Sequence, residues 1–208
     1  MTSDRFKQTL TTSMRDYGIA LSTETVQGLV DYYVLLTRWN ERLHLVAPCG
    51  PEEFATRHVL ESLLLLRFLP TGASVVDIGS GAGLPIIPCL IARSDLFATL
   101  IESSQKKSVF LREALNQIGL SGKAQIIAGT FEETRPPDVG YLTCRALDQF
   151  LNKIHLLVEW APGESVLLLF GGEALRQKLD ALRTHYTEFL IPFSEKRFIY
   201  EVVKSKAN

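Results

Sequence analysis

Three glycines at alternate positions follow an apolar run near the middle of the chain. The run ends at Ile78 and contains Asp77, and Gly79, Gly81 and Gly83 come directly after it. Glycine lacks a Cβ, so it tolerates positive φ and lets backbone N–H groups approach a ligand closely. A strand, a glycine-rich turn and a helix build nucleotide pockets at the carboxyl edge of a parallel sheet. The spacing therefore predicts a nucleotide-type site at this turn.

The carboxylate of Asp77 indicates the charge of the ligand. An acid just before the glycines would repel a pyrophosphate, and the spacing G-x-G-x-G differs from the G-x-G-x-x-G of dinucleotide loops. A dinucleotide-dependent oxidoreductase is therefore disfavoured, and no P-loop sequence occurs. The turn suits a ligand with positive charge, such as the ammonium and sulfonium of S-adenosylmethionine. A tight strand-to-helix turn without a ligand would carry the same glycines.

A second carboxylate, Glu102, ends the next apolar run, residues 98–101. In a strand–helix–strand unit, an acid at this point can accept hydrogen bonds from both ribose hydroxyls. Taken alone, Glu102 could be an ordinary acid at a strand end. Behind the glycine turn, the ribose role is the better interpretation. One of residues 103–105 can cap a helix over 106–118.

Strand and helix patterns alternate around these residues. Strands are expected at 73–78, 98–101, 124–128, within 138–144 and at 166–170, with a terminal hairpin of 187–191 and 198–203. Helices are expected at 23–42, 51–68, 86–92, 106–118, 151–161 and 173–186. This alternation predicts an α/β fold, Rossmann-like, with a mostly parallel sheet and helices on both faces. We expect residues 1–70 to form a helical extension and 71–208 to form the ligand-binding domain, together one compact unit.

Composition fits a compact cytoplasmic protein, and we expect separately that it acts as a monomer. The chain has 208 residues, 46% of them hydrophobic, and a formal net charge of −1. That charge argues against a broad electrostatic hold on nucleic acid but not against a local basic patch. Three scattered cysteines without metal-ligand spacing suggest reduced structural thiols and no metal. No signal-peptide core and no apolar run near the roughly 20 residues that span a bilayer occur, so we expect no membrane association.

Four blocks of residues occur in a characteristic order. They are 39–43 (Trp-Asn-Glu-Arg-Leu), 57–63 (Arg-His-Val-Leu-Glu-Ser-Leu), 77–85 (Asp-Ile-Gly-Ser-Gly-Ala-Gly-Leu-Pro) and 102–107 (Glu-Ser-Ser-Gln-Lys-Lys). The set resembles the small-subunit (16S) rRNA 7-methylguanosine methyltransferase family, formerly called glucose-inhibited division protein B. The resemblance runs from about residue 25 to about residue 172. The glycine turn alone indicates only a class I methyltransferase, and the two upstream blocks make the assignment specific.

The resemblance implies a class I methyltransferase that transfers a methyl group from S-adenosylmethionine to N7 of one guanosine in small-subunit rRNA or in the ribosomal subunit. It implies that the cofactor is bound by Asp77, Gly79, Gly81, Gly83, Leu84, Glu102, Phe131, Glu132 and Arg145. Gly79 and Leu84 would line the methionine side, and Glu102 would hold the ribose. Phe131 and Glu132 would lie beside the adenine. Without the family, Phe131 would be interpreted as core and Glu132 as a surface acid.

No catalytic base is assigned. Guanine N7 carries a lone pair and has no proton to lose, so transfer depends on holding it in line with the sulfonium methyl. Arg145, which the resemblance places at the mouth shared by cofactor and acceptor, is the candidate beside the reacting atoms, although alone it could be a surface ion-pair partner. His58 is expected to be a half-buried structural histidine. The RNA-binding candidates are Arg57, His58, Lys106 and Lys107.

The sequence departs from the family pattern in four places. Ile86 replaces a glycine after Leu-Pro, His44 replaces an asparagine, and Phe170 stands where the fifth strand usually ends in Leu-Lys-Gly. The chain ends at Asn208 without a basic, proline-rich tail. The missing lysine and tail are expected to weaken contacts to phosphate. A methyltransferase with another RNA or small-molecule acceptor, and a cofactor-binding module without catalysis, stay open as alternatives.

Overall fold

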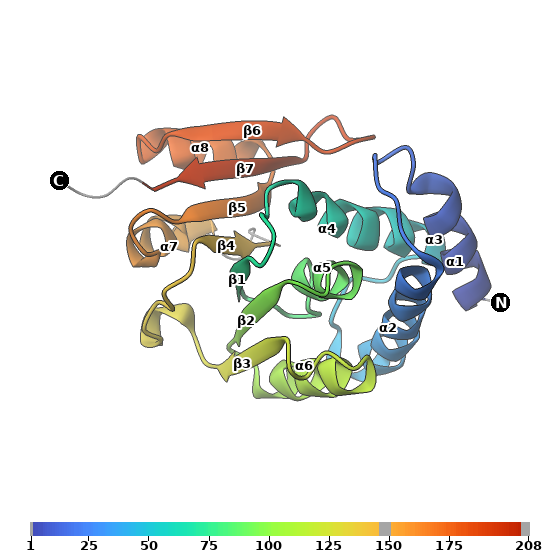
Figure 1. The fold of residues 1–208 in the computed structure, drawn as a ribbon. Coiled ribbons are helices and arrows are strands. Elements are labelled where there is room, and N and C mark those ends of the chain that lie inside the picture. Colours follow the sequence, from blue (N-terminus) through green and yellow to red (C-terminus); the bar gives the residue numbers. More distant parts are fainter. Residues whose placement is uncertain (1, 146–150, 205–208) are drawn as a thin grey trace.

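One mostly parallel sheet organises the chain, as the sequence predicted (Figure 1). The computed structural model describes residues 2–145 and 151–204. Within them the sheet has seven strands in the order β3-β2-β1-β4-β5-β7-β6. The strands are β1 (Ser74–Ile78), β2 (Phe97–Glu102), β3 (Ala124–Ala128), β4 (Tyr141–Cys144), β5 (Val166–Gly171), β6 (Tyr186–Leu190) and β7 (Phe198–Val203).

The strand order locates the ligand crevice. From β1 the chain runs outward through β2 to β3, and it then returns to pair β4 with the other side of β1. In such sheets ligands bind outside the carboxyl ends of the strands at this point of reversal. The first five strands are parallel, whereas β7 is antiparallel to both β5 and β6. The site residues Asp77 and Glu102 lie near the carboxyl ends of the neighbouring strands β1 and β2.

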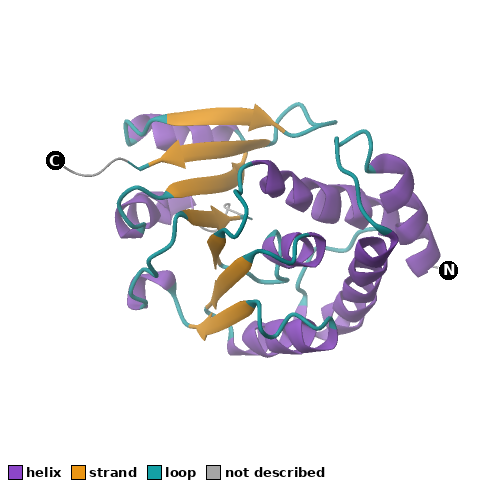
Figure 2. Cartoon of the chain, in the orientation of Figure 1, coloured by secondary structure: helices purple, strands orange, loops and turns teal. Residues whose placement is uncertain are grey.

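Helices cover both faces of the sheet (Figure 2). On one side of the ribbon lie α1 (Thr2–Ser13), α2 (Thr23–Leu43), α3 (Pro51–Glu53), α4 (Glu61–Leu63), α5 (Ile86–Ala92) and α6 (Gln105–Gln117). The other side carries α7 (Ile154–Trp160) and α8 (Glu173–Ala181). Short π and 3-10 segments are η1 (Phe54–Leu60), η2 (Leu64–Arg67), η3 (Phe131–Glu133) and η5 (Leu151–Lys153).

Side chains that alternate along the strands contribute to two hydrophobic cores, one on each face of the sheet. In β1, Val75 packs into the core under the N-terminal helices, whereas Val76 packs into the core under α7 and α8. Successive strand side chains point to opposite faces, so a buried strand needs apolar residues at consecutive positions. The N-terminal helices contribute Phe6 and Leu29 to the same core as Phe110 of α6. Residues before β1 therefore cover one face of the sheet, and the division of the chain at residue 70 stays a prediction.

Three predicted helices differ from those observed, and the predicted helix 151–161 is observed as the 3-10 segment Leu151–Lys153 followed by α7, Ile154–Trp160. The predicted helix 173–186 is wrong at its end, because α8 stops at Ala181. Arg183 adopts a left-handed φ of 53°, and the N–H of Thr184 turns back to the carbonyl of Leu179 at 3.1 Å. The predicted helix 51–68 is one helical path of changing type, in which the π-helix Phe54–Leu60 replaces ordinary α geometry. Sequence periodicity does not reveal such a π segment, which is common at functional sites.

Candidate active site

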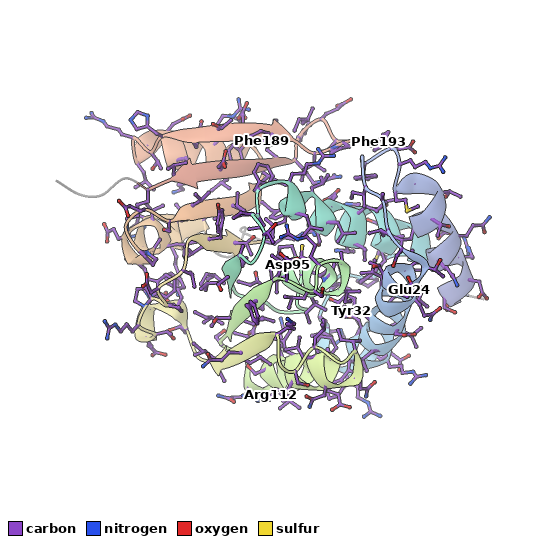
Figure 3. The ribbon with its side chains drawn as sticks, viewed as in Figure 1. Glu24, Tyr32, Asp95, Arg112, Phe189 and Phe193 are labelled. Atoms are coloured by element: carbon purple, nitrogen blue, oxygen red, sulfur yellow. The ribbon has the colours of Figure 1, made fainter. Side chains whose placement is uncertain are left out.

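The glycine turn between β1 and α5 has the backbone that its sequence predicted. Gly79, Gly81 and Gly83 all have positive φ, of 68°, 53° and 82°. The N–H of Gly79 donates to the carbonyl of Ile101 in β2 at 2.9 Å, which ties the turn to the neighbouring strand. The hydroxyl of Tyr32, on α2, donates to the carbonyl of Ala82 at 2.6 Å from a buried position (Figure 3). The turn is therefore held from both sides.

Gly83 is the position where a side chain is least tolerated. A Cβ there would lie 2.7 Å from Ile87 Cγ1 and 3.2 Å from Leu111 Cδ2, whereas a Cβ at Gly81 meets nothing nearer than the Gly79 carbonyl at 3.7 Å. Both positions carry the cost of positive φ, about 1–2 kcal/mol. Gly83→Ala adds overpacking of about 1–3 kcal/mol. We expect urea unfolding to show a loss of about 3 kcal/mol for Gly83→Ala and about 1 kcal/mol for the matched Gly81→Ala. Equal losses would contradict the close packing inferred for Gly83.

Asp77 is a buried carboxylate whose charge is not compensated. Its side chain is fully buried, and neither carboxylate oxygen has a hydrogen-bond partner among the described residues. The hydroxyl of Ser80 donates instead to the backbone carbonyl of Asp77 at 3.0 Å. Burial raises the pKa of Asp77 well above its ordinary value, and the nearby charge of Glu102 raises it further. A buried polar group left in this state requires an explanation, and a cationic ligand would supply one.

Glu102 fastens the glycine turn to the start of α6. Its Oε2 accepts from the N–H of Gly81 at 2.7 Å, and its Oε1 accepts from the N–H of Ser104 at 2.8 Å. Only 6% of the residue is exposed. An ionised carboxylate has about four acceptor positions, so these two bonds leave capacity for a ligand. Of the three candidates for the cap of α6, Ser104 is the one observed, and its Oγ accepts from the N–H of Lys107.

A cavity of about 540 Å³, here called the loop cavity, lies over this turn. Its lining includes Gly79, Gly81, Leu84, Glu102, Lys107 and Arg145, together with residues 44–48. The loop 44–48 is shaped by Asn40, whose Oδ1 accepts from the N–H of Val46 at 2.9 Å. His44, at the end of α2, has the left-handed φ of 47° that an asparagine adopts more readily. His44, which replaces the asparagine of the family pattern, therefore lies in the wall of the loop cavity.

A smaller cavity of about 80 Å³ adjoins the loop cavity, because Gly79 and Ser103 line both. Phe131, 2% exposed, packs edge-on against Trp160 with ring centroids 5.6 Å apart. Glu132 forms an ion pair with Lys153 at 2.6 Å, which helps to lower the pKa of Glu132. Phe131 is therefore a core residue, and its buried ring also lines the small cavity.

Arg145 joins the sheet to the helical segment above it. Its guanidinium donates to Ser62 Oγ at 2.9 Å, to the carbonyl of His58 at 3.3 Å and to the carbonyl of Arg57. It forms an ion pair with the buried Glu61 at 3.3 Å and lies over the Phe170 ring at 5.4 Å. Burial lowers the pKa of Arg145, and Glu61 opposes that shift. Arg145 is therefore a fixed cation in the cavity wall.

His58 has its ring against Phe54 at 5.0 Å and lines the loop cavity. Burial, together with the charges of Arg145 and Arg57, lowers the pKa of His58 to about 4. We expect its imidazole to stay neutral down to about pH 4 in an NMR titration. The fold disfavours the charged form of His58. The free energy of unfolding therefore falls as pH decreases from 6.5, the ordinary pKa of histidine, towards 4. Titration of His58 near pH 6.5 would contradict this geometry.

The structure brings two of the four RNA-binding candidates, His58 and Lys107, to the loop cavity. Arg57 and His58 lie on η1, and Arg57 forms an exposed ion pair with Glu53 at 2.7 Å. Lys107 lines the loop cavity, whereas Lys106 is exposed on α6. Sequence reasoning missed Glu61 and Arg197, which are joined at 2.7 Å although they are far apart in the chain. The acid in the block 57–63 was a signal for Glu61, but nothing local indicated Arg197.

Comparison with known proteins identifies the family. A family model described as rRNA small subunit methyltransferase G matches residues 25–202. A protein named ribosomal RNA small subunit methyltransferase G from Methylobacillus flagellatus is 40% identical over 177 residues, 85% of each chain. One of the same name from Xanthomonas campestris is 39% identical over 157 residues, 73% of this chain and 72% of its own.

The chain belongs to the rRNA small subunit methyltransferase G family. The family and the enzyme class that the four blocks predicted are confirmed. Solved structures agree on the fold. A Bacillus cereus O-methyltransferase in complex with SAH has a TM-score of 0.57 at 15% identity, covering 86% of this chain and 91% of its own. Mitomycin 7-O-methyltransferase has a TM-score of 0.60 at 18% identity, covering 96% and 67%.

Membrane-spanning helices and metal-binding clusters do not occur in the described part of this family member. Over residues 2–145 and 151–204, no helix has the length and apolar character needed to cross a membrane. In the same residues no three His, Cys, Asp or Glu side chains gather where they could hold a metal ion. Its three cysteines are free thiols, with Cys89 and Cys144 buried.

Proposed function

We propose that this methyltransferase transfers the methyl group of S-adenosylmethionine to N7 of a guanosine in bacterial small-subunit rRNA. The observation that carries the proposal is Asp77, a fully buried carboxylate that no described side chain or backbone group pairs, beside a glycine turn. An ammonium or sulfonium would give that charge the partner it lacks, whereas a pyrophosphate would be repelled. Membership of the rRNA small subunit methyltransferase G family supports the choice of RNA as acceptor.

The residues around the turn fit this cofactor. Spare acceptor positions on Glu102 would take the ribose hydroxyls, and the small cavity beside Phe131 and Glu132 would take the adenine. Gly79 and Leu84, which line the loop cavity, would lie along the methionine portion, with Gly81 and Gly83 shaping the turn. When bound, S-adenosylmethionine supplies an electrophilic methyl group. The protein's own residues bind and orient the reactants and restrict water.

The chemistry needs no general base from the protein. Guanine N7 attacks through its lone pair, and no proton leaves that atom. His58, with a pKa lowered to about 4, is a weak base, and its place is in the cavity wall rather than in a proton transfer. The contribution of the chain is positional, since holding a nucleophile in line at near-attack distance removes much of the barrier. A carboxylate or hydrogen-bond acceptors near the base would then stabilise the positive charge that develops on the purine.

The cellular setting belongs to the same proposal. Since small-subunit rRNA is a cytoplasmic substrate, we place the enzyme in the cytoplasm. We propose that it acts as a monomer, without a metal ion and without membrane attachment. The acceptor is either the naked rRNA or the ribosomal subunit.

A comparison of methyl transfer to different acceptors tests the proposal. Purified protein and labelled S-adenosylmethionine are incubated separately with small subunits and with stripped small-subunit rRNA, both from cells lacking this protein. Large-subunit rRNA and bulk tRNA serve as controls. We expect label in at least one small-subunit sample and background counts in the controls. Label confined to tRNA would move the assignment to another RNA acceptor. Cofactor binding without transfer to any sample would favour a non-catalytic module.

A further inference from the structure

A second cavity, of about 460 Å³, opens beside the loop cavity. Arg145 and His58 line both, so the two spaces meet at these side chains. The end of β5, the connection between β6 and β7, and the helical segment η1–α4 form its walls. A ligand in the second cavity would therefore lie next to the cofactor end that faces Arg145. The size is within the range typical of small-molecule pockets.

The walls of the second cavity combine an apolar surface with an excess of positive charge. Phe170, Leu175 and Ile191 supply the apolar part. The charged lining comprises Arg57, Arg145, Lys196 and Arg197, against the carboxylates of Glu61 and Glu173. Such a surface suits a planar base with a polar edge that is attached to a polyanion. It is less suited to an uncharged apolar acceptor.

The connection between β6 and β7 is fixed against the sheet. A Cβ on Gly172, at the end of β5, would lie 2.9 Å from the Lys196 carbonyl, which shows how closely the connection approaches. Ser194 Oγ accepts from the N–H groups of Lys196 and Arg197 at 3.3 and 3.0 Å. Two cations are thus presented by a turn with its own hydrogen bonds. Lys196 and Arg197 are far in sequence from residues 51–68, so the sequence pattern of 51–68 could not predict that they lie in the same wall.

Glu61 orients two guanidinium groups in this wall. The carboxylate is 2% exposed and lies between Arg197, at 2.7 Å from Oε1, and Arg145, at 3.3 Å from Oε2. The Nε of Arg197 is buried and has no hydrogen-bond partner among the described residues. A guanidinium has five N–H donors in a fixed fork, and the Arg197 side chain is 38% exposed, so donors other than the buried Nε stay accessible beside the one that Glu61 holds. Arg197 is therefore oriented by Glu61 and keeps donor capacity for a ligand.

We propose that the second cavity receives the acceptor guanosine of the RNA, that Arg145 and Arg197 bind it, and that Lys196 contacts the adjoining phosphate. This inference rests on the proposed function. Phe170 occupies the position where the family pattern has a lysine, and Lys196 and Arg197 bring positive charge to the same wall. We propose that these two cations offset the missing lysine at this wall.

The placement agrees with the charge balance of the reaction. The N7 lone pair forms the new bond to the methyl carbon, the bond from that carbon to sulfur breaks, and its electron pair stays on sulfur. The positive charge passes from sulfur to the purine, and no proton is released. A cavity wall of cations alone would oppose this transfer. Glu61, as a positioning residue for both arginines, also supplies a buried negative charge that offsets them.

Direct RNA binding tests the inference independently of methyl transfer. Arg197→Gln, Lys196→Gln and the control Arg112→Gln are compared, with Arg112 lying on the far side of the molecule on α6 (Figure 3). The readouts are Kd for labelled small subunits in the presence of S-adenosylhomocysteine, and Kd for S-adenosylhomocysteine itself. We expect about tenfold weaker subunit binding for Arg197→Gln and about threefold for Lys196→Gln, with cofactor affinity within about twofold of wild type. Arg112→Gln should match wild type.

Unchanged subunit affinity in a folded Arg197→Gln protein would overturn the inference. If Arg197→Gln fails to bind cofactor, it is misfolded, and the test then uses the exposed Lys196. An unchanged subunit affinity of the Lys196→Gln protein overturns the inference equally. Glu61→Gln adds a kinetic readout. If the negative charge of Glu61 stabilises the developing positive charge on the purine, kcat should fall by a larger factor than KM rises.

The two proposals fail in distinguishable ways. If the wild-type protein binds subunits through Arg197 without methylating them, the proposed function fails and the binding site stands. If it methylates small-subunit rRNA while Arg197→Gln and Lys196→Gln leave subunit affinity unchanged, the proposed function stands and the binding site fails.

Discussion

Replacing Glu102 by alanine is expected to weaken binding of S-adenosylhomocysteine by about 100-fold or more and to reduce methyl transfer to background. The carboxylate accepts from Gly81 at 2.7 Å and from Ser104 at 2.8 Å, and it is almost fully buried. Hydrogen bonds to a charged group contribute about 1.5–3 kcal/mol each. Alanine removes two proposed contacts to the ribose hydroxyls, and each change of about 1.4 kcal/mol corresponds to a tenfold change in Kd. The bonds from Gly81 and Ser104 are present without the ligand, so their loss weakens the hold on the glycine turn rather than entering Kd directly.

Isothermal titration calorimetry on Glu102→Ala and Glu102→Gln measures the effect. Glutamine keeps one acceptor oxygen and the side-chain volume, so we expect an intermediate loss of about tenfold. Lys106→Ala is a matched control on the exposed surface of the adjoining helix and should leave the affinity unchanged. A Glu102→Ala protein that binds within about threefold of wild type would remove Glu102 from the site.

Asp77→Asn is expected to change stability and cofactor affinity in opposite directions. Without cofactor the substitution removes a buried charge that no described residue pairs, so the variant should be more stable than wild type at about pH 7 by about 1 kcal/mol or more. With cofactor it removes the charge that, in our proposal, pairs with the ligand's cation. We expect about tenfold or greater weakening of the affinity for S-adenosylhomocysteine, whose ammonium would lose a charged partner.

The pH dependence of this stability gain has a defined sign. The pKa of Asp77 is raised in the fold from an ordinary value of 3.8. A raised carboxyl pKa contributes stability below the unfolded pKa, and that contribution is lost as pH rises through the folded pKa. Asparagine does not ionise, so the advantage of Asp77→Asn should shrink towards about pH 4. Urea unfolding at about pH 7 and about pH 4.5 checks this. A stability advantage of Asp77→Asn that grows at the lower pH would contradict the raised pKa of Asp77.

The central part of the fold could be predicted because several independent signals agreed. The strand–glycine–helix pattern placed Asp77 and the turn, and the next apolar run placed Glu102 on the neighbouring strand. In a parallel sheet these two carboxyl ends meet at one edge, which is why residues of separate blocks come together. The hairpin of 187–191 and 198–203 was also confirmed, since its strands are Tyr186–Leu190 and Phe198–Val203.

Other parts of the site depended on long-range packing that local patterns do not encode. The pairing of β7 with β5 brings Arg197 to Glu61, and no periodicity in either segment predicts that contact. The π-helix around Arg57 and the early end of α8 have a different cause, since they follow from local backbone choices that apolar spacing does not show. The roles of Phe131, Glu132 and Arg145 came from the family resemblance and stay proposals for this chain.

The identity of the methylated nucleoside tests the proposed function most directly. Small-subunit rRNA from cells lacking this protein is presented as subunits and as stripped RNA with labelled S-adenosylmethionine, then digested and analysed by mass. We predict that the label is recovered as 7-methylguanosine and that Glu102→Ala abolishes it. Label on any other nucleoside, or no label from a protein that binds S-adenosylhomocysteine, would contradict the proposed function.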